Sequence, residues 1–270
     1  MKFITSFFIL IAFNLDAQVH KLEKIWETDS VIAVPESVLP GKDILYISLI
    51  DGAGWTADGK GGVGKLSREG KIIDSLWITG LNAPKGMGMA GNRLYVADMN
   101  EVVIIDIQNG KIEKKLKIDS AKGLNDITVS DKGIVYVSDS RGAKIWRIEN
   151  DIISLYLDST NGVNGLKAVG DDLYIGWDKS FVKANSQKQI TKIAQVLQQI
   201  DGIEPIGNGD FLLTAWVGYI WYVHADGSVE TLLETQQQKK NTADIGYDQQ
   251  KKIVYVPTFN AKTIVAYSLK

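Results

Sequence analysis

The sequence predicts an all-β protein, a six-bladed β-propeller built from four-stranded antiparallel blades. The first observation behind this prediction is a hairpin unit that recurs along the chain and is clearest from Gly123 to Asp139. In that unit two short β-branched runs flank the turn Ser130-Asp131-Lys132-Gly133. Turn residues of this kind between two apolar runs are typical of a β-hairpin.

The second observation is the spacing of the copies, of which the sequence contains six. Aligned on one residue of the second strand, the copies are separated by 49, 41, 38, 38 and 43 residues. This spacing suits a four-stranded propeller blade of about 40 to 45 residues. A solenoid can share such a period, but strand-turn-strand units without a helix, ending at six copies, favour a closed ring. The aligned residues, which we expect to pack between blades, are Tyr46, Tyr95, Tyr136, Tyr174, Leu212 and Tyr255.

The N-terminal segment differs from the rest of the chain. Lys2 precedes an apolar run from Phe3 to Phe13, and Leu15 and Ala17 stand at the small-residue positions of a cleavage site. Eleven apolar residues are too few for a membrane anchor, which needs about 20. The sequence therefore predicts a signal peptide over residues 1–17, a propeller over residues 18–270, and a periplasmic or secreted protein. The absence of Cys excludes disulfides and a lipidated N-terminal Cys.

The two ends of the mature chain are expected to meet in the sixth blade. A strand-like run from His20 to Ile32 precedes the first repeat, and the last repeat supplies only three strands. The early strand would complete that blade as an N-terminal closing strand and cover an exposed sheet edge. The three late strands are expected at residues 243–247, 253–257 and 263–269.

Blade one contains a long insertion, Asp51 to Gly64, whose last part resembles a phosphate-binding loop. The segment GKGGVGK, Gly59 to Lys65, has the glycines and the lysine of such a loop. The loop also needs a preceding strand, a following helix and a hydroxyl next to the lysine, where this chain has Leu66. The preceding GAGWTAD is expected to be loop and the following residues 66–78 to be strand-turn-strand, so no nucleotide site is predicted.

The remaining blades follow in order with turns at residues 90–92, 108–110, 149–151 and 225–227. Blade four ends in QKQITKIAQVLQQI, residues 187–200, which has moderate helix propensity. The repeat requires a fourth strand at this point, so a strand is predicted. No linker or change of composition indicates a second domain.

Composition narrows the range of partners. The chain is 45% hydrophobic and 23% charged, with a formal net charge of −2. Such a balance is ordinary for a globular domain and lacks the basic surface that binds nucleic acid or an anionic membrane. We expect a monomer that acts on a small molecule, with no nucleic-acid partner and no membrane partner after signal cleavage.

Polar residues recur ten or eleven positions before each aligned residue, on the predicted innermost strands. Because the innermost strands of a propeller line its channel, these side chains should form a ring around the axis. Four of them form a set of oxygen ligands that suits Ca²⁺, although another hard divalent cation would also fit. Softer metals are disfavoured, because the chain has no Cys and its two His residues lie elsewhere. The ring contains Glu36, Lys85, Asn125, Asp126, Asn164, Asp201 and Asp244, and the predicted metal ligands are Glu36, Asn125, Asn164 and Asp201.

These motifs resemble the senescence-marker-protein/gluconolactonase family of six-bladed propellers, which is related to diisopropyl fluorophosphatase and the paraoxonases. The resemblance is carried by PES at Glu36, NDITVSDKG at Asn125, NGL at Asn164 and DGIEPIGNGDF at Asp201. It implies that these residues hold a divalent cation, usually calcium, with Asn125 in the substrate pocket or on the metal. The chain departs from the family where Ser37 and Val38 follow Glu36, where Ile127 follows Asp126, and at Lys85.

A metal-dependent hydrolase of lactones or related esters of small sugar-like molecules follows as the expected function. The cation would polarise the carbonyl oxygen, and a carboxylate of the ring would activate water or attack directly. Catalytic candidates are Asp201, then Asp244 or Asp126. The alternative is a non-catalytic propeller that binds a glycan or protein through the same face. The expected pocket residues are Lys85, Trp55, Asp139, Trp177, Asp178, Trp216, Tyr219 and Phe259, with Asp98 and Asp139 also candidates for turn formation.

Overall fold

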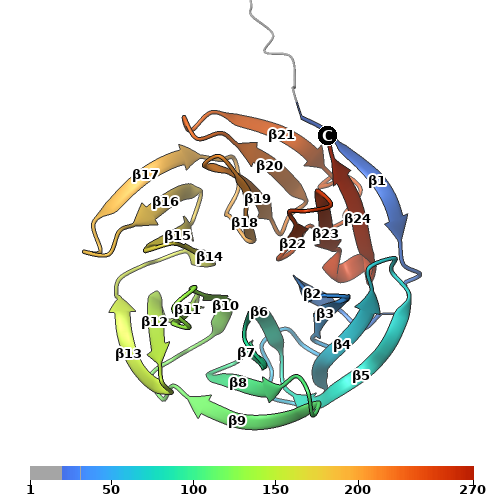
Figure 1. Cartoon of the computed structure of the whole chain (residues 1–270), viewed down its shortest axis with the longest axis vertical. Coiled ribbons are helices and arrows are strands. Elements are labelled where there is room, and N and C mark those ends of the chain that lie inside the picture. The colour runs from blue at the N-terminus through green and yellow to red at the C-terminus, as the bar shows by residue number, and fades with distance from the viewer. Residues whose placement is uncertain (1–19, 31) are drawn as a thin grey trace, which may run out of the picture.

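A computed structural model describes residues 20–30 and 32–270 of the chain. Six four-stranded antiparallel sheets are arranged in a ring around a central axis, which confirms the six-bladed β-propeller (Figure 1). The first strand of each repeat is innermost and the last is at the rim. The predicted signal peptide, residues 1–17, lies outside the described residues. No helix within the described part of the chain is long and apolar enough to span a membrane.

Five blades are formed by consecutive strands, each hydrogen-bonded to the next. Blade one contains β2 (Pro35–Pro40), β3 (Ile44–Leu49), β4 (Gly61–Ser67) and β5 (Ile72–Leu81). Blade two contains β6 (Pro84–Ala90), β7 (Arg93–Asp98), β8 (Glu101–Asp106) and β9 (Lys111–Lys117). Blade three contains β10 (Leu124–Val129), β11 (Val135–Asp139), β12 (Lys144–Glu149) and β13 (Ile152–Leu157). Blade four contains β14 (Val163–Val169), β15 (Asp172–Trp177), β16 (Ser180–Ala184) and β17 (Ile190–Gln195). Blade five contains β18 (Ile203–Gly207), β19 (Asp210–Ala215), β20 (Tyr219–Val223) and β21 (Val229–Glu234).

The sixth blade combines the two ends of the described chain. Its strands are β22 (Gly246–Asp248), β23 (Ile253–Pro257), β24 (Ile264–Leu269) and, at the rim, β1 (Leu22–Glu27) (Figure 1). Strand β1 runs antiparallel to β24, with Leu22 opposite Leu269 and Glu27 opposite Val265. The backbones of Lys21 and Lys270 exchange hydrogen bonds of 3.1 and 3.0 Å. The outer edge of β24 is therefore covered by β1.

The hydrophobic core lies between neighbouring blades, where the faces of adjacent sheets pack on each other. The ring of Phe181 on β16 meets Phe211 on β19 edge-on at 5.0 Å, and Tyr174 on β15 lies 4.5 Å from the same ring. Tyr174 is one of the aligned residues of the repeat, and the equivalent Tyr46 and Tyr255 are buried. The recurrent tyrosines thus join one blade to the next and leave polar residues for the channel.

The glycine-rich segment of blade one is a strand and not a phosphate-binding loop. Residues Gly61 to Ser67 form β4, which pairs with β3 and with an irregular β5. A Cβ atom at Gly62 would lie 2.3 Å from the carbonyl oxygen of Ile78. Close packing of β5 over β4 explains this glycine without a ligand. The end of blade four is also a strand, β17, as the repeat predicted.

Candidate functional site

The ring residues of four blades lie in β-bulges of the innermost strands. In each of these blades, the last residue of the second strand pairs with a residue of the innermost strand. The register between the two strands shifts immediately after that pair, which marks the bulge. A bulge leaves its extra residues out of the regular ladder, so their side chains can be aimed differently from those of a regular strand. The residues skipped in this way are Glu36 in blade one, Lys85 and Gly86 in blade two, Asn125 and Asp126 in blade three, and Asn164 and Gly165 in blade four.

A buried hydroxyl on the second strand holds the innermost strand in three of the blades. The backbone N–H of Ser37 donates to Ser48 Oγ at 2.9 Å, and that of Asp126 donates to Ser138 Oγ at 2.9 Å. In blade five the N–H of Gly202 donates to Thr214 Oγ1 at 2.8 Å. Sequence reasoning missed these residues. The sequence pattern that could have indicated them is a Ser or Thr two positions after the aligned residue in blades one, three and five.

Glycines beside the ring residues allow neighbouring innermost strands to approach closely. A Cβ at Gly165 would lie 1.9 Å from the backbone oxygen of Asp201, and one at Gly86 would lie 2.6 Å from the Cα of Asp126. Any side chain at either position would push two blades apart at the axis. The polar-Gly pairs of the sequence therefore set the width of the channel.

Two buried oxygens at the axis have no hydrogen-bond partner. The Oε2 atom of Glu36 and the Oδ1 atom of Asn164 are both buried and unpaired. Asn164 uses its amide nitrogen to donate to Asp201 Oδ1 at 2.6 Å, which turns its own oxygen away from that carboxylate. Both carboxylates are nearly inaccessible, with 5% of Glu36 and 5% of Asp201 exposed. An unpaired buried carboxylate oxygen is costly unless a ligand or cation completes it.

The charges of the ring act on one another. Burial raises the pKa of Glu36 well above its usual range, and the carboxylates of Asp201 and Asp244 raise it further, while Lys85 opposes the shift. Burial also raises the pKa of Asp201 to about 6 and that of Asp244 to about 7. The carboxyl groups at the axis are thus poorly solvated and keep their protons to a higher pH than exposed carboxyl groups do. A bound cation would favour the ionised form of all three carboxyl groups.

The side-chain oxygens at the axis are of the chemical types that bind a hard cation. Glu36 and Asp201 supply carboxylates and Asn164 an amide oxygen, which are ligands that Ca²⁺ accepts. No three carboxylates of the described channel have oxygens within 4.8 Å of one another, so a cation here would depend on Asn164 as well. Asn125 is half-buried, and no hydrogen bond in the described chain joins it to the other three predicted ligands. The structure therefore supports Asn125 less than Glu36, Asn164 and Asp201.

Asp244 and Asp126, the other predicted catalytic residues, differ in how they are held. Asp244 Oδ2 accepts from Ser37 Oγ at 2.6 Å, and the Asp244 backbone N–H donates to the backbone carbonyl oxygen of Glu36 at 3.1 Å. This contact seals blade one against blade six beside the ring. Asp126 uses both carboxylate oxygens for backbone N–H groups, those of Ile127 and Leu166, each at 2.6 Å. Asp126 therefore links blades three and four, a structural role that sequence reasoning did not foresee.

The channel also contains a partly buried ion pair that sequence reasoning missed. Lys167 Nζ lies 2.8 Å from Glu204 Oε2, between blades four and five. Glu204 and the Asp126 and Asp244 carboxylates raise the pKa of Lys167, although burial opposes them. Lys167 thus neutralises the buried carboxylate of Glu204. The only sequence pattern that could have indicated this pair is its spacing, since Lys167 and Glu204 each lie three residues after a ring residue, Asn164 and Asp201.

Most of the residues expected in the pocket wall lie at or just after the ends of second strands. Trp55 lies in the loop between β3 and β4, with Lys85 Nζ 4.3 Å and the Arg141 guanidinium 5.1 Å from its ring. Trp216 is 42% exposed and packs edge-on against Phe259 at 5.4 Å. Trp177 is partly buried and donates from its indole nitrogen to the Asn161 oxygen at 3.0 Å. Asp178 is exposed at the start of the loop after β15.

Two residues expected in the pocket wall belong to the framework instead. Asp139 is fully buried, and its carboxylate accepts from the backbone N–H of Gly123 at 2.9 Å and of Gly142 at 2.8 Å. Tyr219 is buried in the core between blades four and five, stacks on Trp221, and donates its hydroxyl to Glu234. Neither side chain has surface available for a substrate. The sequence could not separate them from pocket residues, because both stand where a strand meets a loop.

Streptogramin B lyases share this fold. One solved structure is a catalytically inactive histidine-to-alanine variant of virginiamycin B lyase from Staphylococcus aureus with quinupristin. It is 16% identical to this chain, covers 92% of this chain and 99% of its own, and has a TM-score of 0.64. A second streptogramin B lyase is 13% identical, covers 93% and 98% of the two chains, and has a TM-score of 0.65. At these identities the likeness establishes the six-bladed fold alone. The chain matches no protein-family model and no curated protein in sequence.

Proposed function

We propose that this protein is a calcium-dependent hydrolase that opens a lactone or a related ester of a small, sugar-like molecule in its central channel. Glu36, Asn164 and Asp201 would hold the cation. The observation that carries the proposal is the pair of buried, unpaired oxygens, Glu36 Oε2 and Asn164 Oδ1, on opposite blades of one charged ring. Oxygen atoms of this kind are what a hard cation requires and what a purely structural channel would avoid.

When bound, calcium would polarise the substrate carbonyl and stabilise the negative charge that develops on its oxygen. Asp244 would remove a proton from the attacking water, because Ser37 fixes one of its carboxylate oxygens and leaves the other for water. Water adds to the carbonyl carbon, the ester C–O bond breaks, and the proton passes to the departing oxygen. The product of a lactone is then a hydroxy acid. Lys85 is placed beside the ring to attract an anionic group of the substrate or product.

Lyase chemistry like that of the structural neighbours is not proposed. Virginiamycin B lyase is described as catalytically inactive when one of its histidines is replaced by alanine. The two histidines of the present chain, His20 and His224, lie at the rim between blades five and six. The channel therefore has carboxylates for proton transfer and no imidazole.

The test is hydrolysis of aldonolactones and a nitrophenyl ester by the protein with added calcium or excess chelator. We expect calcium to support hydrolysis and the Asp201→Asn and Asn164→Ala variants to lose at least a hundredfold in kcat/KM. Glu149→Gln changes an exposed carboxylate at the end of β12, is the matched control and should retain full activity. Hydrolysis that persists unchanged in chelator would exclude the proposal.

A second candidate is binding of a glycan or protein partner without turnover. It is favoured by the exposed Trp216, which packs against the half-buried Phe259, since aromatic side chains stack well on sugar rings. This function predicts ligand binding that chelator does not change and that Trp216→Ala or Trp177→Ala removes. No turnover across the lactone and ester panel would favour it over hydrolysis.

We further propose that the protein acts in the periplasm or outside the cell. This proposal depends on the charged, apolar and small-residue order of residues 1–17. A mature protein whose first residue is Gln18, recovered outside the cytoplasm and identified by mass, would support it. Full-length protein retained in the cytoplasm would contradict it.

A further inference from the structure

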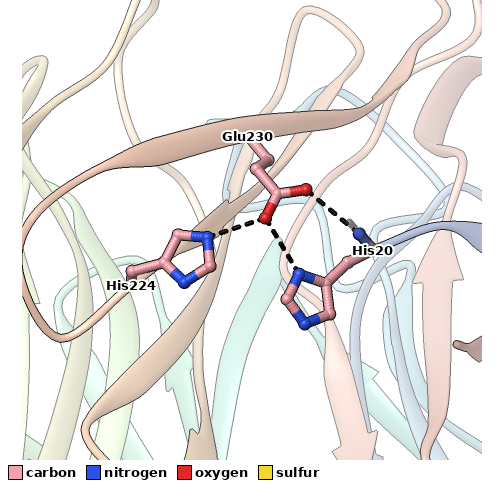
Figure 2. Close-up of side chains that lie close together, drawn as sticks. All are labelled: His20, His224 and Glu230. Carbon is pink, nitrogen blue, oxygen red and sulfur yellow. Dashed lines mark hydrogen bonds and ion pairs between the residues drawn. The ribbon is translucent and has the colours of Figure 1, made fainter. Parts of the chain in front are cut away.

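A cluster of two imidazoles and a carboxylate lies at the rim of the propeller, away from the channel. Figure 2 shows His20, His224 and Glu230 directed toward one another. Glu230 Oε1 lies 2.9 Å from His20 Nδ1 and 2.7 Å from His224 Nε2. One ligand atom from each residue lies within 4.8 Å of the other two. It is the one group of three or more His, Asp or Glu side chains with this geometry among the described residues.

The three side chains come from two blades. His20 lies two residues before β1, the rim strand of blade six, whereas His224 follows β20 and Glu230 lies on β21 of blade five. The backbone N–H of His20 also donates to Glu230 Oε2 at 3.1 Å. The cluster therefore joins the beginning of the closing strand to the neighbouring blade.

The cluster is held in place from its other side. The ring of Tyr222 stacks on His20 with 3.7 Å between ring centres and 10° between planes. The Tyr222 hydroxyl donates to Asp210 Oδ2 at 2.6 Å, which fixes the tyrosine. His20, His224 and Glu230 keep 24%, 29% and 16% of their side chains accessible, so an ion and a water molecule can reach them. A preorganised, partly open set of ligands results.

We infer that His20, His224 and Glu230 form a zinc site that fastens the closing strand β1 to blade five. Two imidazole nitrogens and one carboxylate oxygen are ligands typical of Zn²⁺, with water in the fourth position. Calcium and magnesium prefer all-oxygen sites, so this cluster and the channel select different metals. The carboxylate and the two imidazole nitrogens would supply three of the four ligands of a tetrahedral site.

Only a small adjustment separates the present geometry from a bound ion. Ligand atoms of a tetrahedral zinc site with bonds of about 2.0–2.1 Å lie about 3.3 Å apart. The Glu230 oxygen is 2.7–2.9 Å from the two nitrogens, so each contact would open by about half an ångström. Neutral imidazoles would carry their protons on the opposite ring nitrogens, Nε2 of His20 and Nδ1 of His224. The nitrogens that now face Glu230 would then offer lone pairs to zinc.

The experiment is a calorimetric zinc titration of the metal-stripped protein, together with thermal unfolding with and without zinc. We expect one zinc ion per chain and a higher Tm with zinc. His224→Ala and Glu230→Gln should bind zinc at least a hundredfold more weakly and lose the rise in Tm. Glu234→Gln changes a carboxylate on the same strand, hydrogen-bonded to Tyr219 outside the cluster, and should behave as the unchanged protein.

Two further measurements separate zinc binding at the rim from folding defects of the variants and from metal binding in the channel. Cobalt(II) in the unchanged protein should give the visible absorption of a tetrahedral site, which needs no variant. Asp201→Asn should bind zinc normally, since that residue belongs to the channel. Absence of zinc binding, or equal binding by His224→Ala, Glu230→Gln and the unchanged protein, would overturn the inference.

Discussion

Two sets of buried carboxylates in this propeller differ in what their oxygens contact. Asp98 and Asp139, at the ends of second strands, are fully buried, and their oxygens accept backbone N–H groups of the segments that enter the same blade. Glu36 and Asp201, at the axis, are 95% buried, and Glu36 Oε2 has no partner. Burial is nearly the same in both sets. The two sets therefore differ in their partners: backbone N–H groups complete the first set, whereas an oxygen of Glu36 has no hydrogen-bond partner.

The largest expected effect is a loss of folding stability when one of the carboxylates that accept backbone N–H groups, Asp139, is replaced. Asp139→Ala leaves the N–H group of Gly123 buried without an acceptor and removes the carboxylate that Lys122 and Gly142 also contact, which should lower the free energy of unfolding by about 3 kcal/mol. Calcium should not change this loss. Urea unfolding measures it, with the exposed Asp178→Ala as the control in the corresponding loop of blade four. A loss below about 1 kcal/mol would show that Asp139 does not anchor the blade connection.

Replacing a carboxylate at the axis should change the stability of the calcium-free protein in the opposite direction. Burial raises the pKa of Asp201 to about 6, so its ionised form destabilises the calcium-free fold at pH 8. Asp201→Asn removes that charge and keeps an oxygen for the Asn164 amide, so the calcium-free variant should be more stable by about 1–2 kcal/mol. Urea unfolding in chelator at pH 8 gives the value. Destabilisation like that of Asp139→Ala would remove the distinction between the two sets.

Replacing Lys85 tests how the charge of this lysine affects calcium binding at the axis. Its ammonium group opposes the accumulated negative charge beside Glu36 and would repel a cation at the ring. Lys85→Gln should therefore strengthen calcium binding about tenfold, or about 1.4 kcal/mol. Lys183→Gln, on the outer part of blade four, is the control and should leave affinity unchanged. Weaker calcium binding by Lys85→Gln would mean that the cation does not lie near this lysine.

The smallest effect is expected at the pocket wall. Trp216 is largely exposed and contacts Phe259, so Trp216→Ala should raise KM several-fold and leave kcat and calcium affinity unchanged. Steady-state kinetics on the best lactone of the panel measures both constants. Leu76→Ala, an exposed apolar residue on rim strand β5, is the matched control. A fall in kcat alone would place Trp216 at the reacting atoms and not at the wall.

The repeat was enough to predict the fold, because each copy encodes a hairpin and the spacing fixes the blade. It also located the ring, since equivalent residues of innermost strands must meet at the axis. It could not predict which polar residues are satisfied by the backbone. Asp126 and Asn125 are adjacent in the sequence, yet a bulge directs Asp126 to backbone N–H groups of its own blade and of blade four. The rim cluster of His20 and Glu230 was also beyond the sequence, because 210 residues separate them.

The central claim is that the unpaired oxygens of Glu36 and Asn164, with Asp201, bind calcium. Calorimetric titration of calcium into the metal-stripped protein tests this most directly, with Glu36→Gln and Asp98→Asn as the two variants. We predict one calcium ion per chain in the unchanged protein and in any Asp98→Asn protein that folds, and none in Glu36→Gln. Absence of calcium binding in the unchanged protein, or equal binding by Glu36→Gln, would contradict the account.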